Sequence, residues 1–216
     1  MKNLFRGSIE NETFNLNGLD ISKVTEASDM FSDNPNLKAI NIEGVDFTNL
    51  SLSTILTILL PNSIEKVDLS SVDKTSTLTY SSGYGTFSIY PNKTNLKELI
   101  IPNINFTLCY QGYFFKDSPL EKVSLGNIVS SYYNYSTNNN YYYQYHNLFS
   151  GKTKLREVSV KSLVFYSAYN RVNLSSFFNG CSSLETFDFG TTDTSLNSSL
   201  NSMFKDCKAI KTIDLS

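Results

Sequence analysis

The chain has 216 residues, of which 40% are apolar and 13% aromatic, and this is enough to build a hydrophobic core. Its formal net charge of −2 argues against nucleic-acid binding, because proteins that neutralise phosphates carry a basic surface. The sequence contains no apolar run of about 18 residues, so it predicts no membrane span.

A six-residue phrase recurs eight times along the chain: an apolar residue is followed three and five positions later by two more. The repeats are about 28 residues apart, and periods between roughly 20 and 50 residues are typical of solenoids. The alternation of the last two apolar positions is that of a half-buried strand. We number each repeat from its first apolar residue, position 0, and these residues are Leu16, Leu37, Ile64, Leu96, Leu120, Leu155, Leu184 and Ile210.

The repeats predict an α/β repeat solenoid of leucine-rich-repeat type. It would have about eight repeats, one parallel strand per repeat, and short helices or turns on the opposite side. One repeat cannot bury its apolar face alone, whereas stacked repeats share a continuous core. We therefore expect residues 1–216 to form a single domain. Residues 1–15 precede the first predicted strand and are interpreted as an N-terminal cap or lead-in.

A short helix is predicted between the second and third repeats, in the most apolar stretch of the chain, residues 50–60. Leu52, Ile55, Leu56 and Leu59 have the spacing of one helix face, which indicates an amphipathic helix packed on the core.

Two polar positions carry charges whose sign alternates from repeat to repeat. Neighbouring strands of a sheet lie about 4.8 Å apart, and opposite charges side by side are favourable. The alternation therefore indicates in-register parallel strands. Position +1 holds Lys38, Glu65, Lys97, Glu121, Arg156, Glu185 and Lys211, and position +2 holds Lys66, Glu98, Lys122 and Glu157.

An insertion over residues 130–145 holds seven of the 14 tyrosines, and shorter Tyr-rich segments cover residues 80–85 and 165–171. Tyrosine offers a large amphipathic contact area at low entropic cost, and insertions into solenoids often line the binding face. The alternative is a compositional bias toward Asn and Tyr, with tyrosines that only cover neighbouring turns. The candidate residues for binding a protein or glycan are Tyr132, Tyr133, Tyr135, Tyr141, Tyr142, Tyr143, Tyr145, Tyr166 and Tyr169.

The sequence points to no catalytic, cofactor or metal site. His146 is the single histidine and is interpreted as an ordinary loop residue. Cys181 and Cys207 share position −3 in consecutive repeats, so stacking would place them together, either as reduced buried thiols or as a disulfide. Asp188 and Asp214 share position +4; we expect solvated carboxylates there, with a cation site as the alternative.

The chain reaches Ser216 directly after the last predicted strand, and no polar capping repeat follows in the sequence. Solenoids usually end in such a cap, and an uncovered strand edge is a template for further pairing. We expect either that the chain is part of a longer array or that the edge near Ile213 meets another chain.

The last two repeats, FFNGCSSLETFDF at 177–189 and MFKDCKAIKTIDLS at 203–216, carry the most specific motif, and residues 19–31 share its form. These residues resemble the BspA-like leucine-rich repeat surface proteins, whose pattern is close to MF-x-x-C-x-x-L-x-x-L-D-L-S. The resemblance covers nearly all of the chain after Asn15, and it departs from the family in its irregular spacing and in a Cys position filled only twice. It implies a mildly curved solenoid on a bacterial or protist cell surface that serves adhesion or protein binding.

We therefore expect a non-catalytic recognition or adhesion module that is extracellular or on the cell surface. It would bind a protein or glycan through its strand face and Tyr/Asn-rich insertions. The alternative is a structural repeat that assembles into fibres or a surface layer by end-to-end stacking of strand edges. An enzyme would need a pocket with converging titratable groups, which the sequence does not indicate.

Overall fold

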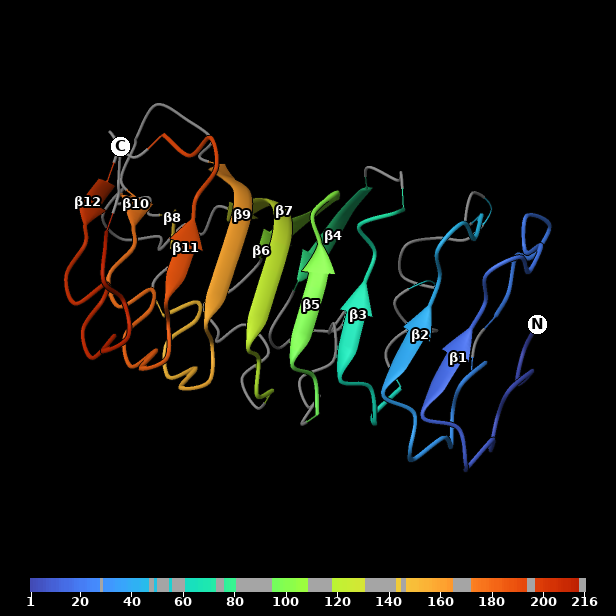
Figure 1. Cartoon of the computed structure of the whole chain (residues 1–216). Coiled ribbons are helices and arrows are strands. Elements are labelled where there is room, and N and C mark those ends of the chain that lie inside the picture. The colour runs from blue at the N-terminus through green and yellow to red at the C-terminus, as the bar shows by residue number, and fades with distance from the viewer. Residues whose placement is uncertain are drawn as a thin grey trace, which may run out of the picture.

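The structure is a computed structural model, and it describes residues 1–27, 29–46, 49, 55, 61–72, 76–80, 95–108, 118–130, 143–144, 147–164, 172–193 and 197–213. Seven parallel strands lie side by side in chain order (Figure 1). They are β1 (Thr13–Asn15), β2 (Ala39–Asn41), β3 (Lys66–Asp68), β5 (Glu98–Ile101), β7 (Lys122–Ser130), β9 (Glu157–Val164) and β11 (Thr186–Asp188). This row confirms the predicted stack of parallel strands.

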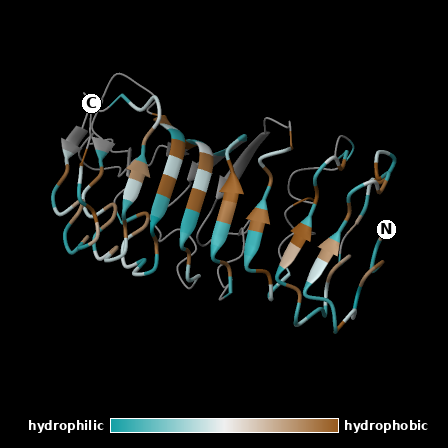
Figure 2. Cartoon of the chain, viewed as in Figure 1, coloured by the Kyte–Doolittle hydropathy of each residue, from teal (hydrophilic) through white to brown (hydrophobic). Residues whose placement is uncertain are grey.

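The residues at position 0 form one interior file beneath this row. Leu37, Ile64, Leu96, Leu120, Leu155 and Leu184 are each at most 1% exposed. Along the strands, hydrophobic and hydrophilic residues alternate, as β7 and β9 show in Figure 2. In the C-terminal repeats, phenylalanine rings stack in the segments that connect one strand of the row to the next. The ring centroids of Phe149 and Phe178 lie 5.7 Å apart, and those of Phe178 and Phe204 lie at the same distance. Removing a ring such as Phe178 would cost about 3–5 kcal/mol.

Four consecutive repeats carry a second strand segment beyond the first. β4 (Ser76–Tyr80) and β6 (Ile104–Leu108) are separate strands, whereas β7 and β9 run on without interruption. β6 pairs in parallel with β4 and with the second half of β7, which in turn pairs with β9. The prediction of one strand per repeat therefore holds for β7 and β9, which are long single strands, and is wrong for the two repeats to which β4 and β6 belong. The reason is a further inward-facing apolar position, where Ile128 and Leu163 are buried.

The return path between consecutive strands of the row was predicted to hold short helices or turns. Where the structure describes it, this path holds turns and a three-stranded parallel sheet of β8 (Tyr143–Gln144), β10 (Val172–Asn173) and β12 (Asn197–Ser199). Of the predicted helix, Ile55 is helical and fully buried, and Leu52, Leu56 and Leu59 lie outside the described residues.

The first repeat is displaced by five residues from its predicted frame. β1 pairs with β2 in the register Phe14↔Ile40, so Phe14 rather than Leu19 holds position +3. Leu16 consequently occupies position +5, and position 0 falls on Asn11. Residues 1–15, interpreted as a lead-in, thus contain the first strand of the row.

A second contact supports this corrected frame. Phe5 lies one repeat before Phe31, with ring centroids 5.4 Å apart, and its N–H donates to the Met30 carbonyl at 3.0 Å. The frame was missed because Leu16, Leu19 and Ile21 satisfy the apolar phrase by coincidence.

In the five turns for which the structure describes both positions, two positions adopt the left-handed backbone conformation. This conformation is unfavourable for most side chains and is most accessible to Gly, Asn and Asp. The sequence supplies such residues, or Ser, four residues apart. Position −8 holds Asn3, Asp29, Asn147, Ser176 and Ser202, and position −4 holds Gly7, Asp33, Gly151, Gly180 and Asp206.

The side chain at position +4 decides how long each strand is. Asn15, Asn41, Asp68 and Asp188 each accept a hydrogen bond from the main-chain N–H two residues later, at 2.7–3.1 Å. This Asx turn ends the strand after three residues. Repeats with Ile100, Ser124 or Ser159 at this position have the longer strands β5, β7 and β9.

Candidate binding face

The outer face of the row is formed by side chains at positions +2 and +4, since successive side chains of a strand point to opposite sides. In β9, Glu157 is exposed and Ser159 half-buried, whereas Val158 and Val160 between and after them are buried. This is the strand face that the sequence predicts to be a binding surface.

Charged residues at positions +1 and +2 pair across the strands in the predicted order. At position +2, Lys66 lies 3.2 Å from Glu98 and Lys122 lies 2.5 Å from Glu157. The registers Lys66↔Glu98, Glu98↔Lys122 and Lys122↔Glu157 make this a continuous ladder. The prediction from the alternating charges, that the strands are parallel and in register, is therefore confirmed for these strands.

The position +1 charges form a second, parallel ladder. Lys97 Nζ lies 2.8 Å from Glu65, and Arg156 lies 3.6 Å from Glu185. The hydrogen bond and charge of Glu65 raise the pKa of Lys97, and those of Glu157 raise the pKa of Lys122. In the four repeats that carry a charge at both positions, the +1 and +2 charges have opposite signs, so this part of the face carries no extended field of either sign. It is suited to a partner recognised by shape and hydrogen bonding rather than by electrostatic steering.

A cavity of about 440 Å³ opens on this face between β2 and β3. One wall is the stretch 39–43, and the other consists of Lys66, Asp68, Ser70 and Ser71. Polar side chains predominate, and main-chain groups of both strands reach the cavity. No sequence signal marked this place, because each of the two strands carries an ordinary repeat.

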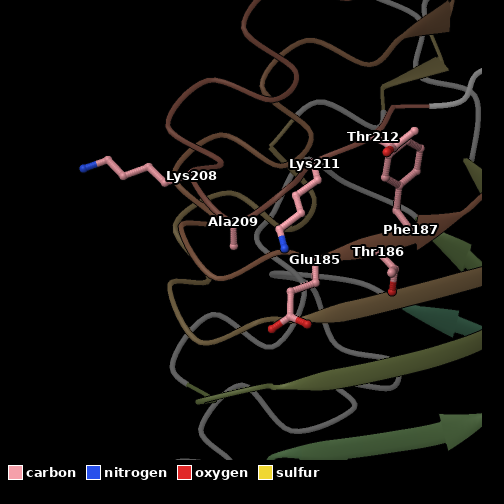
Figure 3. A pocket seen from close by; sticks show the side chains of 7 residues that line it. All are labelled: Glu185, Thr186, Phe187, Lys208, Ala209, Lys211 and Thr212. Atoms are coloured by element: carbon pink, nitrogen blue, oxygen red, sulfur yellow. The ribbon is translucent and has the colours of Figure 1, made fainter.

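A second hollow, of about 740 Å³, lies beside β11 at the C-terminal end of the row. Its walls are Glu185, Thr186 and Phe187 of the row and the segment Lys208, Ala209, Lys211 and Thr212 (Figure 3). Lys211 points toward Glu185, and Lys208 points away from the hollow. The nearby Ile213 is 49% exposed.

Most of the candidate tyrosines cannot be placed on either surface. Tyr132, Tyr133, Tyr135, Tyr141, Tyr142, Tyr145, Tyr166 and Tyr169 lie outside the described residues, and so does His146. Tyr143 begins β8, whose backbone pairs with β10 in the register Tyr143↔Val172.

The two cysteines at position −3 are reduced and buried. The Cys181 thiol donates to the Phe149 carbonyl and the Cys207 thiol to the Phe178 carbonyl, each at 3.1 Å. Burial raises the pKa of Cys181 to about 12 and also raises the pKa of Cys207, so both thiols are unreactive at neutral pH. Of the two alternatives left open by the sequence, the reduced pair is therefore confirmed.

The carboxylate predicted at position +4 has a structural role rather than a free one. Asp188 Oδ1 accepts the Gly190 N–H at 2.7 Å, and Asp214 lies outside the described residues. In the part of the chain that the structure describes, no three His, Cys, Asp or Glu side chains gather to form a metal site. The helical residues described there include no segment long and apolar enough to cross a membrane.

Comparison with protein-family models, with curated proteins and with solved structures gave no significant match to this chain. The resemblance to BspA-like repeats is thus carried by the sequence motif alone.

Proposed function

We propose that this chain is a non-catalytic recognition module of a surface protein. It would bind a protein or glycan through the outer face of its strand row together with the Tyr-rich insertions. The localisation rests on the BspA-like motif, and the binding role on the shape and chemistry of the face.

The observation that best supports this proposal is the charge-compensated face of parallel strands. Its lysines and glutamates are paired with one another, and between them lie short polar groups such as Ser124 and Ser159, whose hydroxyls are 3.2 Å apart. A surface of this kind can offer many hydrogen bonds to a neutral partner without first losing strong ion–water contacts. Its individual salt bridges are exposed and stabilise the fold only slightly.

The experiment is a binding screen of the fluorescently labelled chain on immobilised glycans and extracellular-matrix proteins. Any partner found is then tested against Ser124→Arg/Ser159→Arg, which adds two bulky cations to the face, and against Tyr141→Ala/Tyr142→Ala/Tyr143→Ala. We expect each variant to weaken binding at least tenfold, because interface tyrosines at hot spots contribute about 2 kcal/mol or more. Ile9→Ala, at an exposed residue that precedes β1, serves as the control.

A bound partner that tolerates both variants would contradict the proposal. Circular dichroism of each variant shows whether the strand row is intact, so that a loss of binding is not mistaken for a loss of folding.

A second candidate function, end-to-end assembly into fibres or a surface layer, is favoured by the hollow beside β11. That hollow leaves Phe187 and Thr186 accessible, next to the exposed Ile213. Static light scattering across a dilution series tests this directly. Assembly that grows with concentration and disappears in Ile213→Asp would support it, and a constant monomer mass at high concentration would exclude it.

A further inference from the structure

The row of strands is interrupted at one place. At position +3 the pairs Phe14↔Ile40, Val67↔Leu99, Leu99↔Val123, Val123↔Val158 and Val158↔Phe187 all belong to the ladder. Between β2 and β3 the paired register consists of Ala39↔Lys66 alone. The two strands then move apart toward their C-terminal ends (Figure 1).

Beyond the Ala39↔Lys66 pair, β2 stays hydrogen-bonded to β1, and β3 stays hydrogen-bonded to β5. Leu16 N–H donates to the Asn41 carbonyl at 2.9 Å, which ties β2 to β1. Leu69 N–H donates to the Ile100 carbonyl at 2.7 Å, which ties β3 to β5. The cavity of about 440 Å³ occupies the resulting wedge.

Main-chain groups of both strands point into this wedge. Lys66 N–H donates to the Lys38 carbonyl at 3.2 Å, so Lys66 faces β2. Two residues later, Asp68 N–H and C=O face the same side, because main-chain groups of a strand alternate in direction. In a continuous ladder Asp68 N–H would bond the Ile40 carbonyl, and the observed register ends before this bond.

We propose that this wedge binds an extended peptide segment carrying a basic side chain. The segment adds to the edge of β3, accepts a hydrogen bond from Asp68 N–H and donates one to the Asp68 carbonyl, as in recognition by strand addition. On the opposite wall only Ala39–Asn41 are extended, because the Asn41 Asx turn ends β2, so the wedge holds about three residues of the segment in strand conformation. This inference rests on the proposed recognition function and adds to the charge-compensated face a local site for a basic peptide.

The charges of the walls favour a basic partner. Glu43 has no salt bridge among the described residues. Asp68 Oδ1 is used by Ser70, whose N–H and hydroxyl lie at 3.1 and 2.6 Å, which leaves Oδ2 facing Lys66 at 3.7 Å. Lys66 itself lies closer to Glu98, at 3.2 Å, so the wedge retains an excess of negative charge.

The free chain provides the first test, because Asp188 is the matched control for Asp68. Both residues occupy position +4 and close an Asx turn, but the ladder of Asp188 toward β9 includes Phe187↔Val158. In amide hydrogen exchange followed by NMR, Asp68 N–H should exchange at least tenfold faster than Asp188 N–H. Equal protection of the two amides would mean that the wedge is closed and would overturn the proposal.

Binding is tested with the five-residue peptide acetyl-Thr-Lys-Val-Lys-Thr-amide. Its titration should shift the amide signals of Asp68 and Ile42 and slow the exchange of Asp68 N–H. The acidic counterpart, with Glu for Lys, and a version N-methylated at the central Val should each bind at least fivefold more weakly. The variants Glu43→Gln and Asp68→Asn should each weaken binding about two- to fivefold, the range of exposed ion pairs, whereas Asp188→Asn should leave it unchanged.

Two further results would overturn the proposal. If maltotriose shifts the Asp68 amide and the basic peptide does not, the wedge is a glycan site. If the acidic and basic peptides bind alike, charge plays no part. Either result leaves the recognition function of the face and tyrosines open to its own test, because that screen uses Ser124, Ser159 and Tyr141–Tyr143 rather than the wedge.

Discussion

Cys181 and Asn34 occupy the same position in their repeats, and each donates a hydrogen bond to the carbonyl of a phenylalanine one repeat earlier. Cys181 Sγ lies 3.1 Å from Phe149 O, and Asn34 Nδ2 lies 2.9 Å from Phe5 O. Cys207 repeats the contact with Phe178 O. In these three repeats, position −3 therefore holds a side chain that donates to the preceding repeat. Lys152 has the same position, and its Nζ donates to the Ser118 carbonyl at 3.2 Å.

Removing this donor should destabilise the fold although little volume is lost. Cys181→Ala removes one of the donors to the buried Phe149 carbonyl, which keeps the Lys152 N–H at 3.2 Å, so the expected cost is that of one hydrogen bond, about 0.5–1.5 kcal/mol. Cys181→Ser keeps a donor and should cost less than Cys181→Ala. The free energies of unfolding are measured by urea denaturation, and equal stability of the Ala and Ser variants would show that the hydrogen bond is unimportant.

The buried thiols should also resist alkylation. The test uses the variant Cys109→Ser, which removes the third cysteine of the chain. Only a thiolate reacts with iodoacetamide, and burial raises the pKa of both remaining thiols. At pH 8 the folded chain should therefore react far more slowly than the urea-unfolded chain. Labelling is followed by mass spectrometry. Modification of Cys181 at the unfolded-chain rate would contradict the burial that raises its pKa to about 12.

The same thiol makes stability fall at alkaline pH. The pKa of Cys181 rises from 9.0 in its ordinary environment to about 12 in the folded chain, so between these values the folded state binds more protons than the unfolded state. The contribution of the thiol is fully present below pH 9 and is lost as the pH rises toward 12, by up to about 1.4 kcal/mol per pH unit. Between pH 9 and 11 the wild type should lose stability more steeply than Cys181→Ser. Parallel pH profiles would contradict this.

How far the sequence predicts the structure differs between the strands and the turns. The apolar residues at positions +3 and +5 and the alternating charges predict the strand row and its register, because one-residue slips would expose the core and misplace the charges. The frame of the first repeat is mispredicted, because an apolar phrase alone cannot distinguish Leu16 at position 0 from Leu16 at position +5. The turn residues Asn3 and Gly7 have the same spacing and the same left-handed backbone as Asp29 and Asp33 one repeat later. This spacing in the sequence indicates the correct frame of the first repeat.

The candidate site was less predictable than the fold. The Tyr-rich segments are conspicuous in composition, but composition does not position a side chain. The wedge between β2 and β3 has no local signature, because it arises from a missing pair at Ile40 and Val67, two residues that fit the repeat. The loss of pairing between β2 and β3 depends on both repeats together, so the sequence of either repeat alone cannot predict it.

Reversing one charge in the middle of the position +2 ladder should lower the melting temperature by several degrees. In Lys122→Glu the new carboxylate stands between Glu98 and Glu157, and like charges side by side are unfavourable. Lys161→Glu makes the same change in net charge at an exposed residue of β9 and should have little effect. In 1 M salt the difference between the two variants should largely disappear, because screening acts over about 3 Å. A difference that persists in salt would point to packing rather than charge.

Of the six glycines with a left-handed backbone that the structure describes, Gly190 is the one where adding a single methyl group should be most damaging. Its backbone is left-handed, with φ of +56°, and a Cβ there would collide with the Lys161 carbonyl and lie 2.7 Å from the Val160 carbonyl. These atoms belong to β9, one repeat earlier, so relieving the clash requires β11 to move away from the row. Gly190→Ala should therefore cost more than about 1–2 kcal/mol, the conformational penalty alone. Gly7 is the control, because its φ of +74° is similar but no atom lies within 4 Å of an added Cβ. Chemical denaturation of both variants measures the difference, and equal destabilisation would show that β11 does not pack against β9 as closely as described.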